Sequence, residues 1–173
     1  MGYGVEVEIS GVVILGKNVP RALADLKELM ETASKVGGGS SVSGGVVQRH
    51  FSWVDTDVVL RAIEQGDLVL ALAEWRYSAS GQSTVPSPVE AFTAGITGAA
   101  VYPDVTVDYF EGGKFGDDCE LWETIGEYVE RGAHIIWRGE DGYLWRFEFA
   151  ENCSSFREFT GRIVWEDSYG DPL

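Results

Sequence analysis

The chain has 173 residues, with 28 acidic and 13 basic side chains and a formal net charge of −15. Nucleic acids are bound by Lys and Arg side chains that displace counterions, so this charge argues against nucleic acid as a direct partner, and against anionic membranes for the same reason. A hydrophobic content of 45% and six Trp predict a folded chain with one well-buried core.

The sequence shows no signal for export or membrane insertion. No stretch approaches the ~20 apolar residues of a spanning helix, and the N-terminus lacks the basic-then-apolar order of a signal peptide. The two cysteines, Cys119 and Cys153, make neither a disulfide framework nor a zinc site. We therefore expect a cytoplasmic protein without a metal or a cofactor.

The first half of the chain predicts an alternation of strands and helices. Apolar and polar residues alternate at the start of 4–15, which indicates a strand, and an amphipathic helix begins after Asn18 and ends before Gly37. Gly and Ser at 37–45 predict a flexible loop. Next come a strand at 46–54, a short helix at 57–65 and a strand at 67–77. The last strand begins with residues that are apolar on both faces, as in the centre of a sheet.

The second half predicts a helix followed by a three-stranded meander. A loop at 78–88, a short helix to about Gly98 and a strand at 101–110 come first, and Pro103 places that strand at a sheet edge. A helix capped by Asp117 or Asp118 runs to Gly132. The Asp141-Gly142 turn joins strands 133–138 and 143–149. A last strand at 159–166 and a loose tail at 167–173 complete the chain.

These elements predict a single α+β domain spanning 1–173. Its sheet is antiparallel or mixed, its helices lie mainly on one face, and its C-terminal part is a helix plus a meander. A helix ending in Gly, a strand and a Trp-Arg pair occur in both 46–78 and 101–166. That parallel indicates either a weak internal duplication or the ordinary tendency of helices to end in Gly.

Carboxylates are the most abundant functional groups of the sequence. Nine acids and one base, Lys114, lie between Asp104 and Glu130. Four glutamates are spaced i, i+3, i+7 and i+10 and are predicted to form one exposed ridge of the C-terminal helix. We assign partner binding to this ridge and to two aspartates before it: Glu120, Glu123, Glu127, Glu130, Asp104 and Asp108.

Two other interpretations of the same acids stay open. The first is a solvated face whose only role is solubility, since surface acids keep proteins soluble. Alternatively, the oxygens of Asp104, Asp108, Asp117 and Asp118 are suitable ligands for calcium or magnesium, although their spacing is not that of an EF-hand loop.

No catalytic residues are assigned. The sequence contains no Gly-x-Ser-x-Gly elbow and no His-Glu-x-x-His motif, and its two histidines, His50 and His134, lie on predicted strands. Cys119 opens a helix beside several acids, which predicts an unreactive thiol. The Trp-Arg pairs of the meander favour core aromatics with exposed arginines. The alternative is a ligand pocket lined by Arg138, Trp145, Arg146 and His134.

Several strings between about Val46 and Trp165 resemble a group of small uncharacterised proteins of phages, prophages and mobile elements. The resemblance rests on Phe51-Ser52-Trp53-Val54-Asp55-Thr56, Trp75-Arg76, Gly116-Asp117-Asp118, Leu121-Trp122, Ile125, Val129-Glu130, Gly132, Ile135, Gly139-Glu140-Asp141-Gly142 and Trp145-Arg146. It implies a phage or mobile-element origin and transfers no catalytic residue.

The sequence as a whole favours a binding protein over an enzyme. In context, the resemblance implies an accessory protein that binds and inhibits a basic host or defence protein, one that itself binds nucleic acid, through an acidic surface. The alternatives are a nucleotide-like small-ligand binder or hydrolase that uses the aromatic and Arg sheet face, and a structural or assembly protein. The sequence does not predict the oligomeric state.

Overall fold

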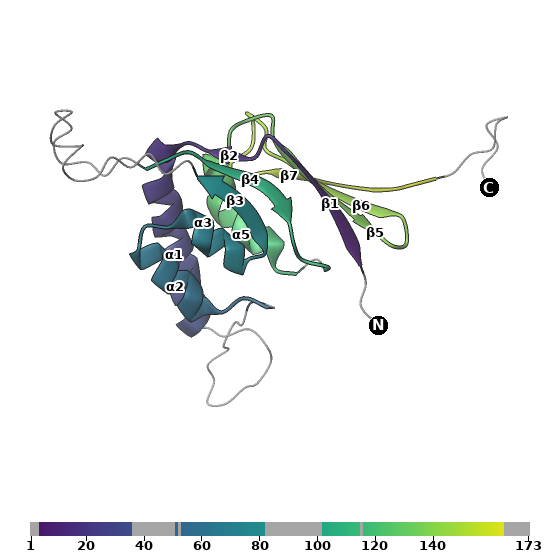
Figure 1. Ribbon diagram of the computed structural model, residues 1–173. Helices are drawn as coiled ribbons and strands as arrows, with labels where there is room; N and C mark the ends of the chain where they lie inside the picture. The colour runs from purple at the N-terminus through teal and green to yellow at the C-terminus, as the bar shows by residue number, and fades with distance from the viewer. Residues whose placement is uncertain (1–3, 36–50, 52, 82–101, 115, 165–173) are drawn as a thin grey trace.

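The computed structural model describes residues 4–35, 51, 53–81, 102–114 and 116–164, which form an α+β fold with two antiparallel sheets. Figure 1 shows the helices gathered at one end of the molecule, while the β5–β6 hairpin extends away from them. The four-stranded sheet has the order β1-β5-β6-β7 and the three-stranded sheet the order β2-β4-β3. The strands are β1 (Val5–Ser10), β2 (Val13–Ile14), β3 (Tyr77–Gly81), β4 (Val105–Phe110), β5 (His134–Gly139), β6 (Tyr143–Glu148) and β7 (Arg157–Arg162).

The helices cover the apolar core with amphipathic faces. They are α1 (Val19–Lys35), α2 (Thr56–Glu64), α3 (Leu68–Glu74) and α5 (Asp118–Ile125), with 3-10 turns at Gly16–Asn18 and Gly126–Tyr128. Helix α1 agrees with the prediction and buries Ala22, Leu26 and Met30 completely. Helix α2 also agrees: the side chain of Asp55 caps it by accepting hydrogen bonds from the N–H groups of Asp57 and Val58.

The strand predicted over 4–15 is two strands that belong to different sheets. Glycine at position 11 has φ +67°, a conformation that residues with a side chain rarely adopt, and the chain turns there. Before the turn, β1 pairs with β5; after it, β2 pairs with β4. Val5, Val7 and Ile9 share one face of β1 and pack on the core, as the alternation predicts.

The strand predicted at 67–77 is wrong, because Leu68–Glu74 forms α3. Its buried residues, Leu68, Ala71 and Leu72, are spaced i, i+3 and i+4, while Leu70 is 45% exposed. The carboxylate of Asp67 accepts a hydrogen bond from the Leu70 N–H and caps the helix. A short apolar run does not distinguish a buried strand from a buried helix, so the cap was the informative signal.

The edge position predicted for the strand at 101–110 is also wrong. Strand β4 begins at Val105, after Pro103, and lies between β2 and β3 in its sheet. Proline therefore precedes the ladder and removes no hydrogen bond from it. Residues 78–81, predicted as loop, belong to β3. Likewise, Phe51 and Trp53 do not share a strand face, because Phe51 is buried and Trp53 lies exposed in a turn.

The C-terminal meander is confirmed. Strands β5 and β6 pair through the turn at Gly142, and β7 pairs with β6. The preceding helix is shorter than predicted, since α5 ends at Ile125 and a 3-10 turn follows.

After Gly66 the chain forms α3, whereas after Gly132 it forms β5, so 46–78 and 101–166 do not share the order of elements on which the predicted repeat was based. The loop at 37–45, the helix before Gly98 and the tail at 167–173 lie outside the described residues.

Candidate functional site

A buried hydrogen-bond network joins β3 to the beginning of α5. The Tyr77 hydroxyl donates to Asp118 Oδ1 at 2.5 Å and accepts from Trp122 Nε1 at 3.0 Å. The N–H of Gly116 donates to Asp118 Oδ2 at 2.8 Å. Burial raises the pKa of the Asp118 carboxyl above its ordinary value, and burial together with the nearby Asp118 charge raises the pKa of Tyr77. Because every polar atom in this set has a partner, we assign it a structural role.

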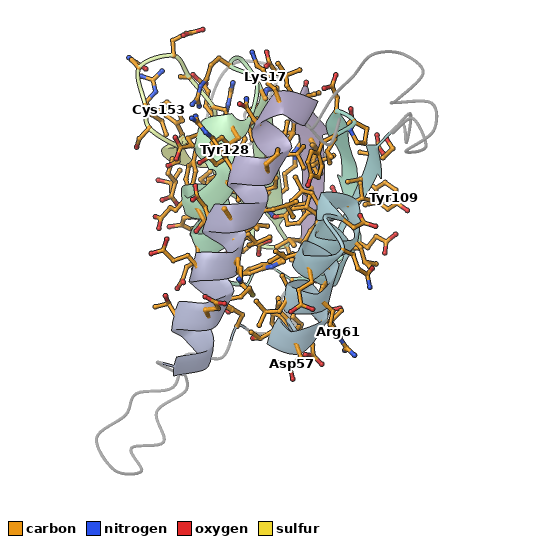
Figure 2. The ribbon with its side chains drawn as sticks, turned by 90° about the vertical axis from the view of Figure 1, so that its left-hand side faces the viewer. Lys17, Asp57, Arg61, Tyr109, Tyr128 and Cys153 are labelled. Atoms are coloured by element: carbon orange, nitrogen blue, oxygen red, sulfur yellow. The ribbon has the colours of Figure 1, made fainter. Side chains whose placement is uncertain are left out.

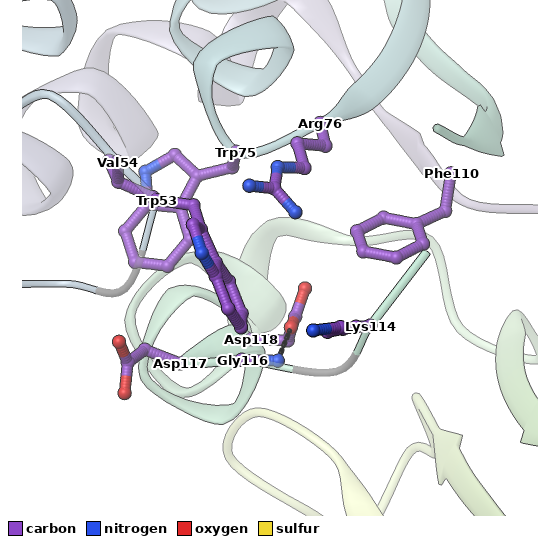
Figure 3. A pocket seen from close by; sticks show the side chains of 9 residues that line it. All are labelled: Trp53, Val54, Trp75, Arg76, Phe110, Lys114, Gly116, Asp117 and Asp118. Atoms are coloured by element: carbon purple, nitrogen blue, oxygen red, sulfur yellow. Dashed lines mark hydrogen bonds between the residues drawn. The ribbon is translucent and has the colours of Figure 1, made fainter. Parts of the chain in front are cut away.

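A small pocket borders this network and shares Gly116 and Asp118 with it. Figure 3 shows Trp53 on one side and Phe110 on the other, with Arg76 and Lys114 between them. The Arg76 guanidinium carbon lies 4.9 Å from the centre of the Trp53 ring, and Lys114 Nζ lies 5.9 Å from it. Both are within the range of cation–π attraction. The pocket thus combines two cations with an indole that is 53% exposed.

The backbone at this pocket is strained at two positions. Trp53 has φ +64° and Arg76 has φ +68°, and they are the only non-glycine residues with positive φ in the described part of the chain. Arg76 follows Trp75, the C-cap of α3, and so lies at the position where glycine usually ends a helix. A left-handed residue with a side chain costs roughly 1–2 kcal/mol. Such strain concentrates at functional sites, so the meeting of two strained residues singles out this pocket.

In the described part of the chain, neither cation of the pocket forms an ion pair, although Asp117 and Asp118 also line the pocket. Within the described ranges, no carboxylate lies at ion-pair distance from Arg76 or Lys114. The pocket has a volume of about 10 Å³, which is room for roughly one water molecule. The pocket is therefore too small for a whole nucleotide. Its lining also includes the carboxylates of Asp117 and Asp118, so an oxyanion bound there would meet two acids as well as two cations.

An acidic face extends over α1, α5 and the turn that follows α5. It consists of Asp25, Glu28, Glu120, Glu123 and Glu127, and we call it the acidic face. A shallow groove lined by Asp25, Glu28 and Thr124 shows that the two helices are neighbours here. The hydroxyl of Tyr128 donates to Asp25 Oδ2 at 2.5 Å and ties the turn to α1, which faces the viewer in Figure 2.

Part of the predicted ridge belongs to this face and part of it does not. Glu120 and Glu123 lie on α5 and Glu127 lies in the 3-10 turn, so the four glutamates do not form one helical row. Glu130 follows the turn, and its backbone N–H donates to the Val13 carbonyl. Thus α1 contributes acids that the sequence pattern did not predict, because a contact between distant helices leaves no mark on local spacing.

The two predicted aspartates are placed elsewhere. Asp104 Oδ1 accepts a hydrogen bond from the Gly16 N–H at 2.6 Å and holds the turn before α1, and Asp108 lies on β4. In the described part of the chain, no three His, Cys, Asp or Glu side chains are arranged to hold a metal ion. The described residues therefore give no support to a cation site formed by Asp104, Asp108, Asp117 and Asp118.

Cys119 lies beside the acidic face with a strongly suppressed thiolate. Burial, followed by the charges of Glu158 and Glu123, raises its pKa to about 11. The sequence predicted an unreactive thiol because acids lie near it. In the structure, the acids with the largest effect on its pKa are Glu158 and Glu123. The thiolate is the reactive form, so this cysteine is not a candidate nucleophile at neutral pH.

The ligand pocket predicted at Arg138, Trp145, Arg146 and His134 is not assembled by the sheet. Three of these side chains contact glutamates: Arg138 and His134 both contact Glu8, and Arg146 contacts Glu148. These three side chains lie on the outer face of the sheet, while Trp145 is opposite Trp137 on the core face. The sequence interpretation of core aromatics with exposed, ion-paired arginines describes this arrangement.

Comparison of the chain with protein families, with curated proteins and with solved structures found no significant match. Among the described helices, none combines the length and the apolar character needed to cross a membrane. The acidic face and the Trp53 pocket are therefore the two features on which a functional proposal can rest.

Proposed function

We propose that this is a phage- or mobile-element-encoded accessory protein that acts in the host cytoplasm by binding a basic protein. The acidic face supports the proposal. Glu28, Glu123 and Glu127 expose their carboxylates, and no Lys or Arg of the described part lies within ion-pair distance of them. This is the single observation that carries the proposal.

The physical argument is one of complementary charge. Like charges held close together on neighbouring elements repel one another, and a cationic partner removes that repulsion. The carboxylates of the acidic face present negative charges to a protein that otherwise holds a phosphate backbone, and long-range attraction accelerates the encounter. A host or defence protein that binds nucleic acid has the required basic surface.

Charge reversal on the acidic face tests this proposal. We expect the variant Glu123→Lys/Glu127→Lys to lose affinity for the partner by at least about 100-fold, because close charge pairs at interfaces contribute roughly 1.5 kcal/mol or more each and two of them together contribute about 3 kcal/mol. Affinity capture from host lysate followed by mass spectrometry identifies the partner, and titration calorimetry with that purified protein measures the loss.

The matched control is Glu64→Lys/Glu151→Lys. Both residues are exposed and lie outside the acidic face, and the change in net charge is the same. A basic protein held by the wild type and by this control, but not by the face variant, supports the proposal. Equal capture by all three proteins contradicts it, provided that circular dichroism shows each of them folded.

A second candidate function is the binding of a small oxyanion at the Trp53 pocket. It is favoured by the strained backbone at Trp53 and Arg76 and by two cations that form no ion pair with a described residue. Two cations lie around one exposed indole here, in a chain whose net charge is −15. For the alternative that the protein binds a small ligand, we therefore propose this pocket as the binding site instead of the sheet face.

Titration with inorganic phosphate tests the pocket. We expect the indole N–H signal of Trp53 in nuclear magnetic resonance spectra to shift in a saturable way, and the variant Lys114→Gln to weaken the response at least about threefold, because it removes one of the two cations. Lys27→Gln is the control, since Lys27 pairs with Glu31 on α1. An unchanged response in Lys114→Gln would exclude the site.

A further inference from the structure

Strand β7 presents an open edge of the four-stranded sheet. It is the last strand in the order β1-β5-β6-β7, and all six of its residues are exposed. No described strand pairs with its outer side. Phe159 is 46% exposed and Ile163, just beyond the strand, is 40% exposed. An open edge with apolar side chains is a template for pairing with another strand.

The hydrogen bonds between β7 and β6 show which backbone groups of β7 face outward. The N–H of Ile163 donates to the Gly142 carbonyl at 2.9 Å, on the side of β6. Backbone groups of an antiparallel strand alternate in direction from one residue to the next. Odd-numbered residues of β7 therefore bond to β6, and Glu158, Thr160 and Arg162 direct their N–H and C=O groups to the open side.

The side chains of the same three residues share one face of the sheet. They are opposite Phe147, Trp145 and Tyr143 of β6. Neither Glu158 nor Arg162 forms an ion pair within the described part of the chain, and Arg162 only lies over the Tyr143 ring at 5.9 Å. Four residues along a strand span about 13 Å, so these two charges cannot neutralise each other within one molecule.

We infer that β7 pairs antiparallel with β7 of a second copy of this chain, around a twofold axis at Thr160. In this register, Glu158 of each copy is opposite Arg162 of the other, and Thr160 is opposite Thr160. These three pairs consist of residues whose backbone groups point outward. Their hydrogen bonds therefore form while the other residues of β7 stay bonded to β6. Phe159 lies opposite Gly161 and covers it, as aromatic side chains do for glycines in sheets.

The charges select this register over its neighbours. A shift by two residues in one direction places Glu158 opposite Thr160 and Phe159 opposite itself. A shift in the other direction places Arg162 opposite Thr160 and leaves Glu158 opposite Val164. Shifts by one residue pair outward-facing groups with inward-facing ones and make no hydrogen bonds. Only the register centred on Thr160 joins opposite charges, and it joins them twice.

A charge-swap experiment tests the dimer. Sedimentation equilibrium of the wild type at roughly physiological salt, where general repulsion between two acidic bodies is screened, should show a monomer–dimer equilibrium. Glu158→Arg and Arg162→Glu each place like charges opposite one another, and each should raise the dissociation constant at least tenfold. The double variant Glu158→Arg/Arg162→Glu restores both pairs and should return within about threefold of the wild type. Arg138→Glu, a charge reversal on β5, is the control and should have no effect.

A second variant keeps the test decisive if the charge changes disturb folding. Thr160→Pro removes an outward N–H and leaves the β6–β7 ladder intact, since proline is tolerated on the solvent side of an edge strand. It should be a monomer with unchanged circular dichroism. A wild type that stays monomeric at millimolar concentration, or a dimer that survives Thr160→Pro, would overturn the proposal. The acidic-face test uses Glu123 and Glu127, so the two proposals succeed or fail separately.

Discussion

Replacement of Tyr77 by Phe is expected to lower the free energy of unfolding by about 2–4 kcal/mol. The change deletes one oxygen atom in a fully buried position and removes two hydrogen bonds: Asp118 Oδ1 loses its Tyr77 donor, while Oδ2 keeps the Gly116 N–H, and Trp122 Nε1 loses its acceptor. Each buried group left unsatisfied costs roughly 1–3 kcal/mol. Urea denaturation followed by Trp fluorescence measures the difference.

The control for this prediction is Tyr109→Phe. Tyr109 is 53% exposed and donates only to the exposed carboxylate of Glu111. Water replaces that hydrogen bond, so we expect a change within about 0.5 kcal/mol, as for ordinary surface substitutions. Similar losses for the two variants would show that the Tyr77 network does not connect β3 to α5 in the way described.

Replacement of Gly16 by Ala is expected to destabilise the protein by at least about 2 kcal/mol. A Cβ atom at this position would lie 1.9 Å from the carbonyl oxygen of Tyr102 and 2.8 Å from its carbonyl carbon. Both atoms belong to the backbone, so no side-chain rotation relieves the overlap. Forced insertion of a methyl group into close-packed structure typically costs 1–3 kcal/mol. The shift would also disturb the hydrogen bond from the Gly16 N–H to Asp104.

The matched substitution is Gly113→Ala. A Cβ at Gly113 meets no atom within 4 Å, and the residue lies exposed in the loop after β4. Its thermal midpoint should equal that of the wild type or exceed it slightly, because alanine restricts the unfolded chain more than glycine does. A Gly16→Ala variant as stable as Gly113→Ala would mean that the contact between the first 3-10 turn and Tyr102 is not tight.

The two candidate sites differ in how far the sequence predicted them. Local spacing predicted exposed acids on α5, and Glu120 and Glu123 do lie there. It did not predict Asp25 and Glu28, since their proximity to α5 depends on the packing of α1. It did not predict the Trp53 pocket either, because Trp53, Arg76 and Lys114 come from three separate loops. The one local signal for that pocket was Arg76 just past the C-cap of a helix, and the sequence interpretation of 67–77 as a strand concealed it.

Local chemistry by itself determined α1 through its apolar periodicity, α2 through its Asp55 cap, and the β5–β6 hairpin through its Asp141-Gly142 turn. It also determined which face of β1 is apolar, because alternation needs no knowledge of the partner strand. The tertiary structure alone decided that Leu68–Glu74 is a helix, that the chain changes sheets at Gly11, and which carboxylates gather on one face. The periodicity of a sequence shows on which face of its own helix or strand a residue lies. Contacts between elements depend instead on how the connecting chain brings those elements together in three dimensions.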